Sequence, residues 1–373
     1  MKKIRTLIVD VSVVFRSQIR AALEEIPGIE VMGVAPTGKI ALQKLTQNQV
    51  DLVILDLEMP EMSGKELLAE LRKKAIYPKI IVFSSYSQRG AEVTLDALRL
   101  GASDFVPKPS GDIPEDQPRD PKDRIRVLLS DKILNLFEIE PAKPIHKYTP
   151  SIETHKKEET PTPTAPWTPI YPKAIVIGSS TGGPSALEDI FSRISAPVSC
   201  PIFIVQHMPP LFTATLAERL QKISGIPAAE GKHNEFAQPN RIYIAPGDFH
   251  MRLVQGTEGV LITLNQDPLE HSVRPAVDQL FVSAAKIFKS SLFGIVLSGM
   301  GQDGLIGATE IRSSGGKVMI QNKESCVVFG MPGAIFAAGA YDKIGDLQVI
   351  SQTISEAVGD MIQPLSEMNG GSK

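Results

Sequence analysis

Short apolar runs alternate with amphipathic stretches along the first 138 residues of the chain. Five runs have the composition of buried parallel strands, and helix-period spacing of apolar positions separates them. The alternation predicts a doubly wound, flavodoxin-like α/β domain with helices on both faces of a parallel sheet. The expected strands lie at residues 6–9, 29–34, 52–55, 79–83 and 104–106.

This pattern stops after residue 138. A polar, proline-rich loop at 111–121 leads into a helical pattern at 122–137. Proline, threonine, lysine and glutamate then dominate residues 139–172, a composition that buries too little apolar surface to fold. We therefore expect a domain at 1–138, a flexible linker at 139–172 and a second domain at 173–365.

The second domain has its own series of apolar runs. They predict a second doubly wound, Rossmann-like parallel sheet, with a hairpin formed by 251–254 and 260–263 around two glycines. The expected parallel strands are residues 174–177, 202–205, 241–245, 294–297 and 317–320.

Three of these runs lead to residues with catalytic chemistry. The first enters a glycine-rich turn that presents Ser180, the second ends at His207, and the third ends at Asp303, so that His207 and Asp303 are both expected at strand ends. A serine nucleophile needs an imidazole to take its proton and a carboxylate to orient that imidazole. The pattern predicts such a triad at one sheet edge, in an order that differs from the Ser, Asp, His of α/β-hydrolases.

An alternative interpretation of the glycine-rich turn stays open at this point. A phosphate-cradling loop at a helix N-terminus has a similar composition, with Ser180 or Thr181 as a helix cap. The turn lacks both the spacing of a dinucleotide fingerprint and the Gly-Lys-Ser/Thr of a P-loop. This alternative leaves the positions of His207 and Asp303 unexplained.

Four segments of the second domain, in register, resemble the catalytic domain of bacterial chemotaxis receptor methylesterases, and the first domain resembles the response-regulator receiver of that family. The resemblance covers essentially the whole chain. The segments are Ile177-Gly-Ser-Ser-Thr-Gly-Gly183, Val205-Gln-His-Met-Pro209, Leu297-Ser-Gly-Met-Gly-Gln-Asp-Gly304 and Gln321-Asn-Lys-Glu-Ser-Cys-Val-Val-Phe-Gly-Met-Pro332.

The resemblance implies roles for residues of the second domain. Ser180 corresponds to the nucleophile, His207 to the general base and Asp303 to its orienting acid. Thr181 and Met300 match positions that help to bind the oxyanion and the substrate. Without the resemblance, Thr181 is a helix cap and Met300 a core residue.

His250 and His271 are alternative bases, less favoured because neither directly follows a predicted strand. Arg274 lies in the segment Ser272-Val-Arg-Pro-Ala-Val-Asp278, which matches a family segment near the substrate cleft. We expect a structural ion pair for Arg274 rather than contact with substrate.

The resemblance to receivers likewise implies a phosphorylation site. Asp56 matches the phosphoacceptor, Lys108 the lysine that pairs with the phosphoryl group, Ser84 the switch hydroxyl and Phe105 the switch aromatic. A histidine kinase is the implied phosphodonor.

One position departs from the receiver pattern. Receivers carry two acidic residues after the first strand, whereas this chain has Asp10 followed by Val11. Magnesium would then be held by Asp10, Asp56 and the Glu58 carbonyl, without a carboxylate at position 11. We expect weakened magnesium binding and altered phosphorylation.

Composition bears on nucleic-acid binding, membrane insertion and the cellular compartment. The 373 residues carry a net charge of −3, which gives no reason to expect nucleic acid. No apolar run is long enough for membrane insertion. Only Cys200 and Cys326 are present, without a metal or redox motif, which favours a reduced cytoplasm.

The resemblance implies hydrolysis of glutamyl γ-methyl esters on methyl-accepting chemoreceptors, and deamidation of selected glutamines, with no metal in the hydrolytic step. It also implies a receiver that covers the cleft until phosphorylation. Two alternatives remain: a non-catalytic two-domain signalling adaptor, and a serine esterase or amidase for another substrate.

Overall fold

The computed structural model describes residues 3–109, 118–137, 171–194 and 197–359. Its contacts divide the chain into two compact units, Met1–Glu159 and Thr160–Lys373. Residues 139–170 of the expected linker and 111–117 of the expected loop lie outside the described residues. The limits of the domains and of the linker stay predictions, and each unit is described by itself.

The first unit contains a five-stranded parallel sheet in the order β2-β1-β3-β4-β5. All five predicted strands and the predicted helix at 122–137 are confirmed. The elements are β1 (Ile4–Val9), α1 (Val13–Glu24), β2 (Ile29–Ala35), α2 (Gly38–Gln47), β3 (Leu52–Leu55), α3 (Gly64–Lys73), β4 (Lys79–Ser84), α4 (Gln88–Arg99), β5 (Asp104–Pro107) and α5 (Pro121–Leu136).

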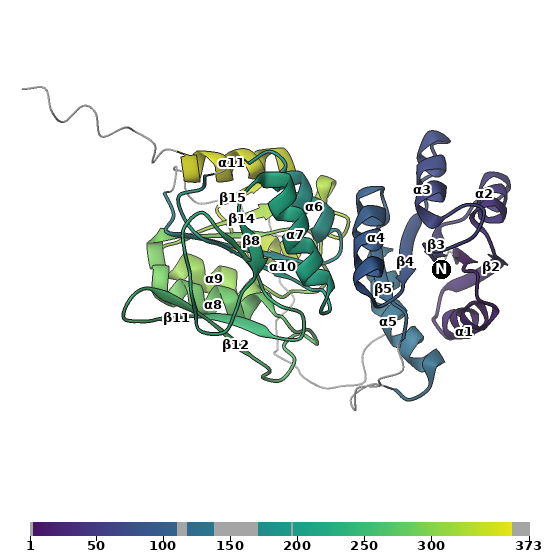
Figure 1. Cartoon of the computed structure of the whole chain (residues 1–373), viewed down its shortest axis with the longest axis horizontal. Helices are drawn as coiled ribbons and strands as arrows, with labels where there is room; N and C mark the ends of the chain where they lie inside the picture. The colour runs from purple at the N-terminus through teal and green to yellow at the C-terminus, as the bar shows by residue number, and fades with distance from the viewer. Residues whose placement is uncertain (1–2, 110–117, 138–170, 195–196, 360–373) are drawn as a thin grey trace, which may run out of the picture. The chain divides into compact units, whose positions relative to one another are not determined.

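Helices cover both faces of this sheet. Helix α1 packs against α5, and α3 packs against α2 and α4 (Figure 1). Short polar residues begin these helices: Ser63 accepts a hydrogen bond from the backbone amide of Glu66, whose side chain accepts one from the Ser63 amide. Such caps end each loop at a defined residue, so the carboxyl ends of β1, β3 and β5 present Asp10, Asp56 and Lys108 at one edge.

The second unit contains a seven-stranded parallel sheet, ordered β15-β14-β13-β6-β7-β10-β8, and a three-stranded antiparallel sheet, ordered β11-β12-β9. Its strands are β6 (Ala174–Ser179), β7 (Ile202–Gln206), β8 (Ala228–Glu230), β9 (Glu235–Phe236), β10 (Ile242–Ile244), β11 (His250–Gln255), β12 (Val260–Asn265), β13 (Leu292–Val296), β14 (Lys317–Gln321) and β15 (Lys343–Gly345). Its helices are α6 (Gly183–Phe191), α7 (Phe212–Ser224), α8 (Val277–Phe288), α9 (Leu305–Ser313), α10 (Met331–Ala337) and α11 (Leu347–Gly359), with 3-10 turns at Lys289–Ser291 and Lys323–Ser325.

The predicted parallel strands and the hairpin of the second unit are confirmed. Three strands were not predicted, namely β8, β9 and β15, each of two or three residues at the edge of its sheet. Strands this short carry too few alternating or apolar positions to stand out from a loop.

The order of the strands places a topological switch point beside β6. The chain passes from β6 to β7 on one side, whereas β13 pairs with β6 on the other, so the loops that follow these strands diverge. Ligand sites of open α/β sheets lie at such points. Helices α8 and α9 pack together (Figure 1). Both helices contact β13, and α8 also contacts β6.

A glycine lets α8 approach the sheet closely. A Cβ atom on Gly178, in β6, would lie 2.5 Å from Val277 Cγ1 in the first turn of α8. Gly304, before α9, faces the same valine, with a Cβ position 3.1 Å away. The first turn of α8 is therefore held against the carboxyl end of β6.

We expect Gly178→Ala to destabilise the second unit by about 1–3 kcal/mol, because the new methyl group overpacks this contact. Differential scanning calorimetry of the full chain measures the change. The control is Gly33→Ala in β2, where the new atom meets only the flexible end of Lys44, and a change within about 0.5 kcal/mol is expected. Equal effects of the two substitutions would contradict the close approach of α8.

Candidate active site

His207 and Asp303 form a buried pair at the carboxyl edge of the second sheet. His207 Nε2 lies 2.8 Å from Asp303 Oδ2, and their side chains are 10% and 2% exposed. His207 directly follows β7, as predicted. Asp303 does not end a strand, contrary to the expectation: β13 ends at Val296, and a glycine-rich loop carries the chain to Asp303 just before α9.

The first turn of α8 holds the Asp303 carboxylate. Val277 donates its backbone N–H to Oδ2 at 2.6 Å, and Asp278 donates its N–H to Oδ1 at 2.9 Å. These amides lack partners within their own helix, and the helix dipole favours a negative charge beside them. Burial alone would raise the pKa of Asp303, but the hydrogen bond and charge of His207 together with these amides lower it below its usual range.

The ionisation of Asp303 decides the tautomer of His207. An ionised carboxylate only accepts hydrogen bonds, so Nε2 of the imidazole must carry the proton at the 2.8 Å contact. Nδ1 is then left as the basic nitrogen of the neutral ring. This arrangement gives His207 the chemistry of a general base whose free nitrogen faces away from Asp303.

Ser180 lies beside this pair at the same edge. Strands β6 and β7 pair with Ser179 opposite Gln206, so Ser180 and His207 are the next residues on neighbouring strands. Ser180 is half-buried. Among the described residues, no hydrogen bond joins its hydroxyl to His207. Such contacts are often long without substrate and tighten in the complex.

The backbone of the serine turn is fixed by side chains from neighbouring strands. Gln206 donates from Nε2 to the Ser180 carbonyl at 2.9 Å and accepts at Oε1 from the Ser179 hydroxyl at 2.7 Å. The Ser298 hydroxyl donates to the Thr181 carbonyl at 2.7 Å. A Cβ on Gly299 would lie 2.9 Å from Ser180 Cβ, so only glycine leaves room for the serine there.

The roles of Gln206 and Ser298 were not predicted from the sequence. Both lie within the segments that carry the family resemblance, directly before His207 and Gly299, but nothing in a single sequence separates a clamping side chain from its neighbours. Thr181 is buried, with its carbonyl held by Ser298, and Met300 is half-buried in the loop that leads to Asp303.

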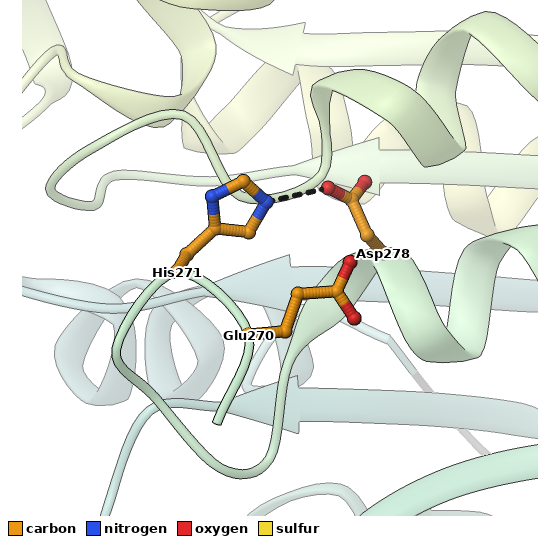
Figure 2. A group of neighbouring side chains, drawn as sticks. All are labelled: Glu270, His271 and Asp278. Atoms are coloured by element: carbon orange, nitrogen blue, oxygen red, sulfur yellow. Dashed lines mark hydrogen bonds and ion pairs between the residues drawn. The ribbon is translucent and has the colours of Figure 1, made fainter. Parts of the chain in front are cut away.

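A second imidazole–carboxylate pair adjoins the first. His271 Nε2 lies 3.0 Å from Asp278 Oδ2, and Figure 2 shows the His271 ring turned toward this carboxylate, with Glu270 nearby. His271 Nε2 is also 4.0 Å from Asp303 Oδ1. Within the described part of the chain, these are the three side chains grouped closely enough to hold a metal ion. Their atoms are instead engaged with one another and with Gln279, which donates to Glu270.

Asp278 is an unusual carboxylate. It is 2% exposed and lies next to Asp303. Burial and the negative charge of Asp303 raise the pKa of Asp278 to about 6, against opposing hydrogen bonds from the Gly307 amide and His271. The site therefore contains two neighbouring carboxyl groups, one with a lowered and one with a raised pKa.

Other candidate residues have structural partners. His250 is fully buried, with Nε2 3.1 Å from the Pro268 carbonyl and Nδ1 accepting the Ala276 N–H at 3.2 Å, which leaves it no role as a base. Arg274 pairs with Asp248 and donates to two backbone carbonyls, in agreement with the expected ion pair. Burial raises the pKa of the Cys200 and Cys326 thiols to about 12 each, so neither thiol competes as nucleophile.

In the first unit, Lys108 joins the two predicted acidic residues. Its Nζ lies 2.8 Å from Asp56 Oδ2 and 2.9 Å from Asp10 Oδ2. Burial raises the pKa of Asp56, and so does the charge of Asp10, although Lys108 and the Glu58 amide oppose them. Burial alone would lower the pKa of Lys108, but its two carboxylate partners raise it.

Position 11 offers no ligand to this acidic site. The Val11 side chain is 46% exposed at the rim of this site.

The switch residues Ser84 and Phe105 are buried. Ser84 receives a 2.6 Å hydrogen bond from Thr94 and lies 3.3 Å from the Gly90 carbonyl. The Phe105 ring lies 6.0 Å from Lys132 Nζ. Among the described residues, no hydrogen bond joins Ser84 to Asp56.

Sequence comparisons match both units. The CheB methylesterase family matches residues 175–354, and the response regulator receiver domain matches residues 6–114. A protein-glutamate methylesterase/protein-glutamine glutaminase of Trichodesmium erythraeum is 42% identical over 359 residues, 96% of this chain and 100% of the relative. The chain belongs to the CheB methylesterase family. A protein of the same name from Nocardioides is 41% identical over 354 residues, 92% of each chain.

Among solved structures, the Thermotoga maritima CheB methylesterase catalytic domain is 41% identical and covers 51% of this chain and 100% of its own, with a TM-score of 0.49. The CheB methylesterase match spans Ser180, His207 and Asp303, and the receiver match spans Asp10 and Asp56. No helix in the described ranges has both the length and the apolar character needed to cross a membrane.

The raised pKa of Asp278 sets the sign of its effect on stability. Between the ordinary aspartate pKa of about 4 and the folded value of about 6, the folded state binds more protons than the unfolded state. This carboxyl group contributes stability at low pH that is lost as the pH rises through about 6. We expect Asp278→Asn to gain stability relative to the parent protein between about pH 4 and pH 7, on the order of 1–3 kcal/mol.

Thermal melting across this pH range measures the difference. Asp189→Asn is the matched control, because Asp189, on α6, forms a partly exposed pair with Arg193 just after that helix. A relative stability of Asp278→Asn that does not change with pH would contradict the raised pKa.

Proposed function

We propose that this protein hydrolyses glutamyl γ-methyl esters on the cytoplasmic part of chemoreceptors, with Ser180 as nucleophile, His207 as general base and Asp303 as orienting acid. The observation that carries the proposal is the buried 2.8 Å contact between His207 and Asp303, beside Ser180, in a member of the CheB methylesterase family. Its relatives are named protein-glutamate methylesterase/protein-glutamine glutaminase, which supports the same ester substrate and adds glutamine deamidation.

The proposed reaction has two steps. Ser180 Oγ attacks the γ-carbonyl carbon while His207 Nδ1 takes the hydroxyl proton, and this proton then leaves with methanol. An acyl-enzyme remains on Ser180. Water, deprotonated by the same nitrogen, hydrolyses this ester to glutamate and free serine. With a glutamine side chain, ammonia leaves in place of methanol.

The serine turn favours the negative charge that develops during both steps. Helix α6 begins at Gly183, three residues after Ser180, so the positive end of its dipole lies close to the reacting carbonyl. Thr181 and Met300 flank the site, where we assign them to oxyanion and substrate binding.

The receiver unit supplies regulation through Asp56. A histidine kinase donates the phosphoryl group to this carboxylate, and Lys108, now bound to it, pairs with the product. The new charge at Asp56 shifts the equilibrium between two conformations of the receiver, and Ser84 and Phe105 are the residues that change between them. We propose that the unphosphorylated receiver inhibits the catalytic unit and that phosphorylation relieves the inhibition.

Magnesium would be held by the carboxylates of Asp10 and Asp56 and by the Glu58 carbonyl, and would neutralise the charge that gathers during phosphoryl transfer. These oxygen donors fit the ion, because Asp10 Oδ2 and Asp56 Oδ2 are buried carboxylate oxygens that already hold a cation, the Lys108 ammonium, at 2.9 Å and 2.8 Å. The Val11 side chain has no oxygen ligand, so this site has one carboxylate fewer than the usual receiver site.

The decisive experiment measures methanol release from a methylated chemoreceptor cytoplasmic fragment. We expect Ser180→Ala to reduce release by at least about 10³-fold, because the nucleophile is lost. Ser192→Ala, at an exposed serine after α6, keeps full activity as the matched control. Acetyl phosphate with magnesium increases release by the parent protein.

Three other results would indicate a different function or a different mode of regulation. No release from the receptor fragment, together with turnover of small methyl esters, would indicate another substrate. Absence of both activities would favour the adaptor alternative. Release that ignores acetyl phosphate would leave the esterase in place and contradict regulation by phosphorylation.

We expect Val11→Asp to tighten magnesium binding roughly tenfold, because it supplies the missing oxygen ligand. Isothermal titration calorimetry measures the affinity, and mass spectrometry measures phosphorylation by acetyl phosphate. Val13→Asp places the same charge on an exposed residue two positions away and serves as control. Equal magnesium affinity in the parent protein and the Val11 variant would overturn the idea of a weakened site.

A further inference from the structure

Two buried carboxylates meet at the first turn of α8, and each holds one imidazole. Asp303 contacts His207, and Asp278 contacts His271, at 2.8 Å and 3.0 Å. The pairs are connected: the Asp278 amide donates to Asp303 Oδ1, and His271 Nε2 lies 4.0 Å from the same oxygen. Oδ1 of Asp303 therefore faces His271, while Oδ2 faces His207.

The backbone that presents His271 adopts an uncommon conformation. His271 and Ser272 have φ angles of 52° and 63°, in the left-handed region that non-glycine residues rarely adopt. Two backbone hydrogen bonds between Glu270 and Val273 close this turn, at 3.1 Å and 2.9 Å. Strained turns of this kind gather at functional sites, where the surrounding structure holds them in place.

Asp278 also lowers the stability of the folded protein. It is buried beside a second carboxylate, and burial and that neighbour raise its pKa to about 6. A well-packed neutral side chain at this position would avoid the repulsion. Stability is commonly given up in this way where an active site requires a particular charge arrangement.

We infer that His271 and Asp278 are positioning residues for the proposed reaction: together they fix the Asp303 carboxylate so that it holds His207 with Nδ1 free toward Ser180. The inference rests on the proposed roles of Asp303 and His207. Neither positioning residue needs to touch substrate.

The contacts show how the positioning operates. Asp278 orients His271 through Oδ2, and its Oδ1 is itself fixed by the Gly307 amide at 2.7 Å, at the start of α9. His271 Nε2, in contact with Asp278 at 3.0 Å, then places the polar edge of the imidazole 4.0 Å from Asp303 Oδ1, the oxygen that does not contact His207. Glu270, bound by Gln279, is the other charged group of this cluster.

The test compares kcat and KM for ester hydrolysis in full-length variants. We expect His271→Gln to lower kcat roughly tenfold with KM within about twofold, because a transition-state contact made through Asp303 is weakened. His233→Gln is the matched control, because His233 is an exposed histidine bound to the Leu264 amide in the antiparallel sheet, and it leaves both constants unchanged.

A double-mutant cycle separates positioning from a general structural role. In an Asp303→Asn background, His271→Gln is expected to cause no further loss, because its effect passes through the Asp303 carboxylate. Additive losses would overturn the inference, and so would unchanged kcat in the single variant. If His271→Gln fails to fold, Asp278→Asn is measured in the same cycle, with the same two results expected.

The same set of variants distinguishes this inference from the proposed function. Loss of hydrolysis in Ser180→Ala and Asp303→Asn, with full activity in His271→Gln, would leave the triad standing and remove only the positioning role. Full hydrolysis in Asp303→Asn would overturn both.

Discussion

The hydrogen bonds from the first turn of α8 to Asp303 are the constraint on which the rest of the catalytic unit depends. They place a buried negative charge at a helix N-terminus, where unpaired amides and the helix dipole stabilise it. Because that charge is stable, the His207 imidazole beside it has a defined tautomer. The reactivity that we propose for Ser180 follows from this chain of contacts.

The fold supplies this arrangement through close packing. Gly178 lets the first turn of α8 reach the sheet, and Gly299 leaves room for Ser180. The strand order around β6 then brings the loops after β6, β7 and β13 to one edge. Large side chains at the two glycines would separate groups that must lie within hydrogen-bond distance, so the glycines serve the site as well as the core.

Much of the architecture could be predicted from the sequence, because the strands of parallel sheets are continuous apolar runs. His207 followed from its place directly after such a run. The position of Asp303 was predicted only in outline, because a single sequence does not show that six loop residues separate it from the end of β13.

Asp278 and His271 illustrate what a single sequence does not reveal. His271 was considered only as an alternative base, and Asp278 only as the end of a family segment. Their pairing depends on a turn with two left-handed residues, which no propensity favours, and on the tertiary approach of α8 to the Asp303 loop. The roles of Gln206 and Ser298 could not be predicted for the same reason, because they depend on hydrogen bonds to residues that are distant in the sequence.

The most direct test of the central claim is the rate at which a fluorophosphonate probe labels the protein, with the modified residue located by mass spectrometry. The account predicts one adduct, on Ser180, formed rapidly in the parent protein and at least about 10²-fold more slowly in Asp303→Asn, because the base loses its orientation. Labelling of another residue, or equal rates in the two proteins, would contradict it.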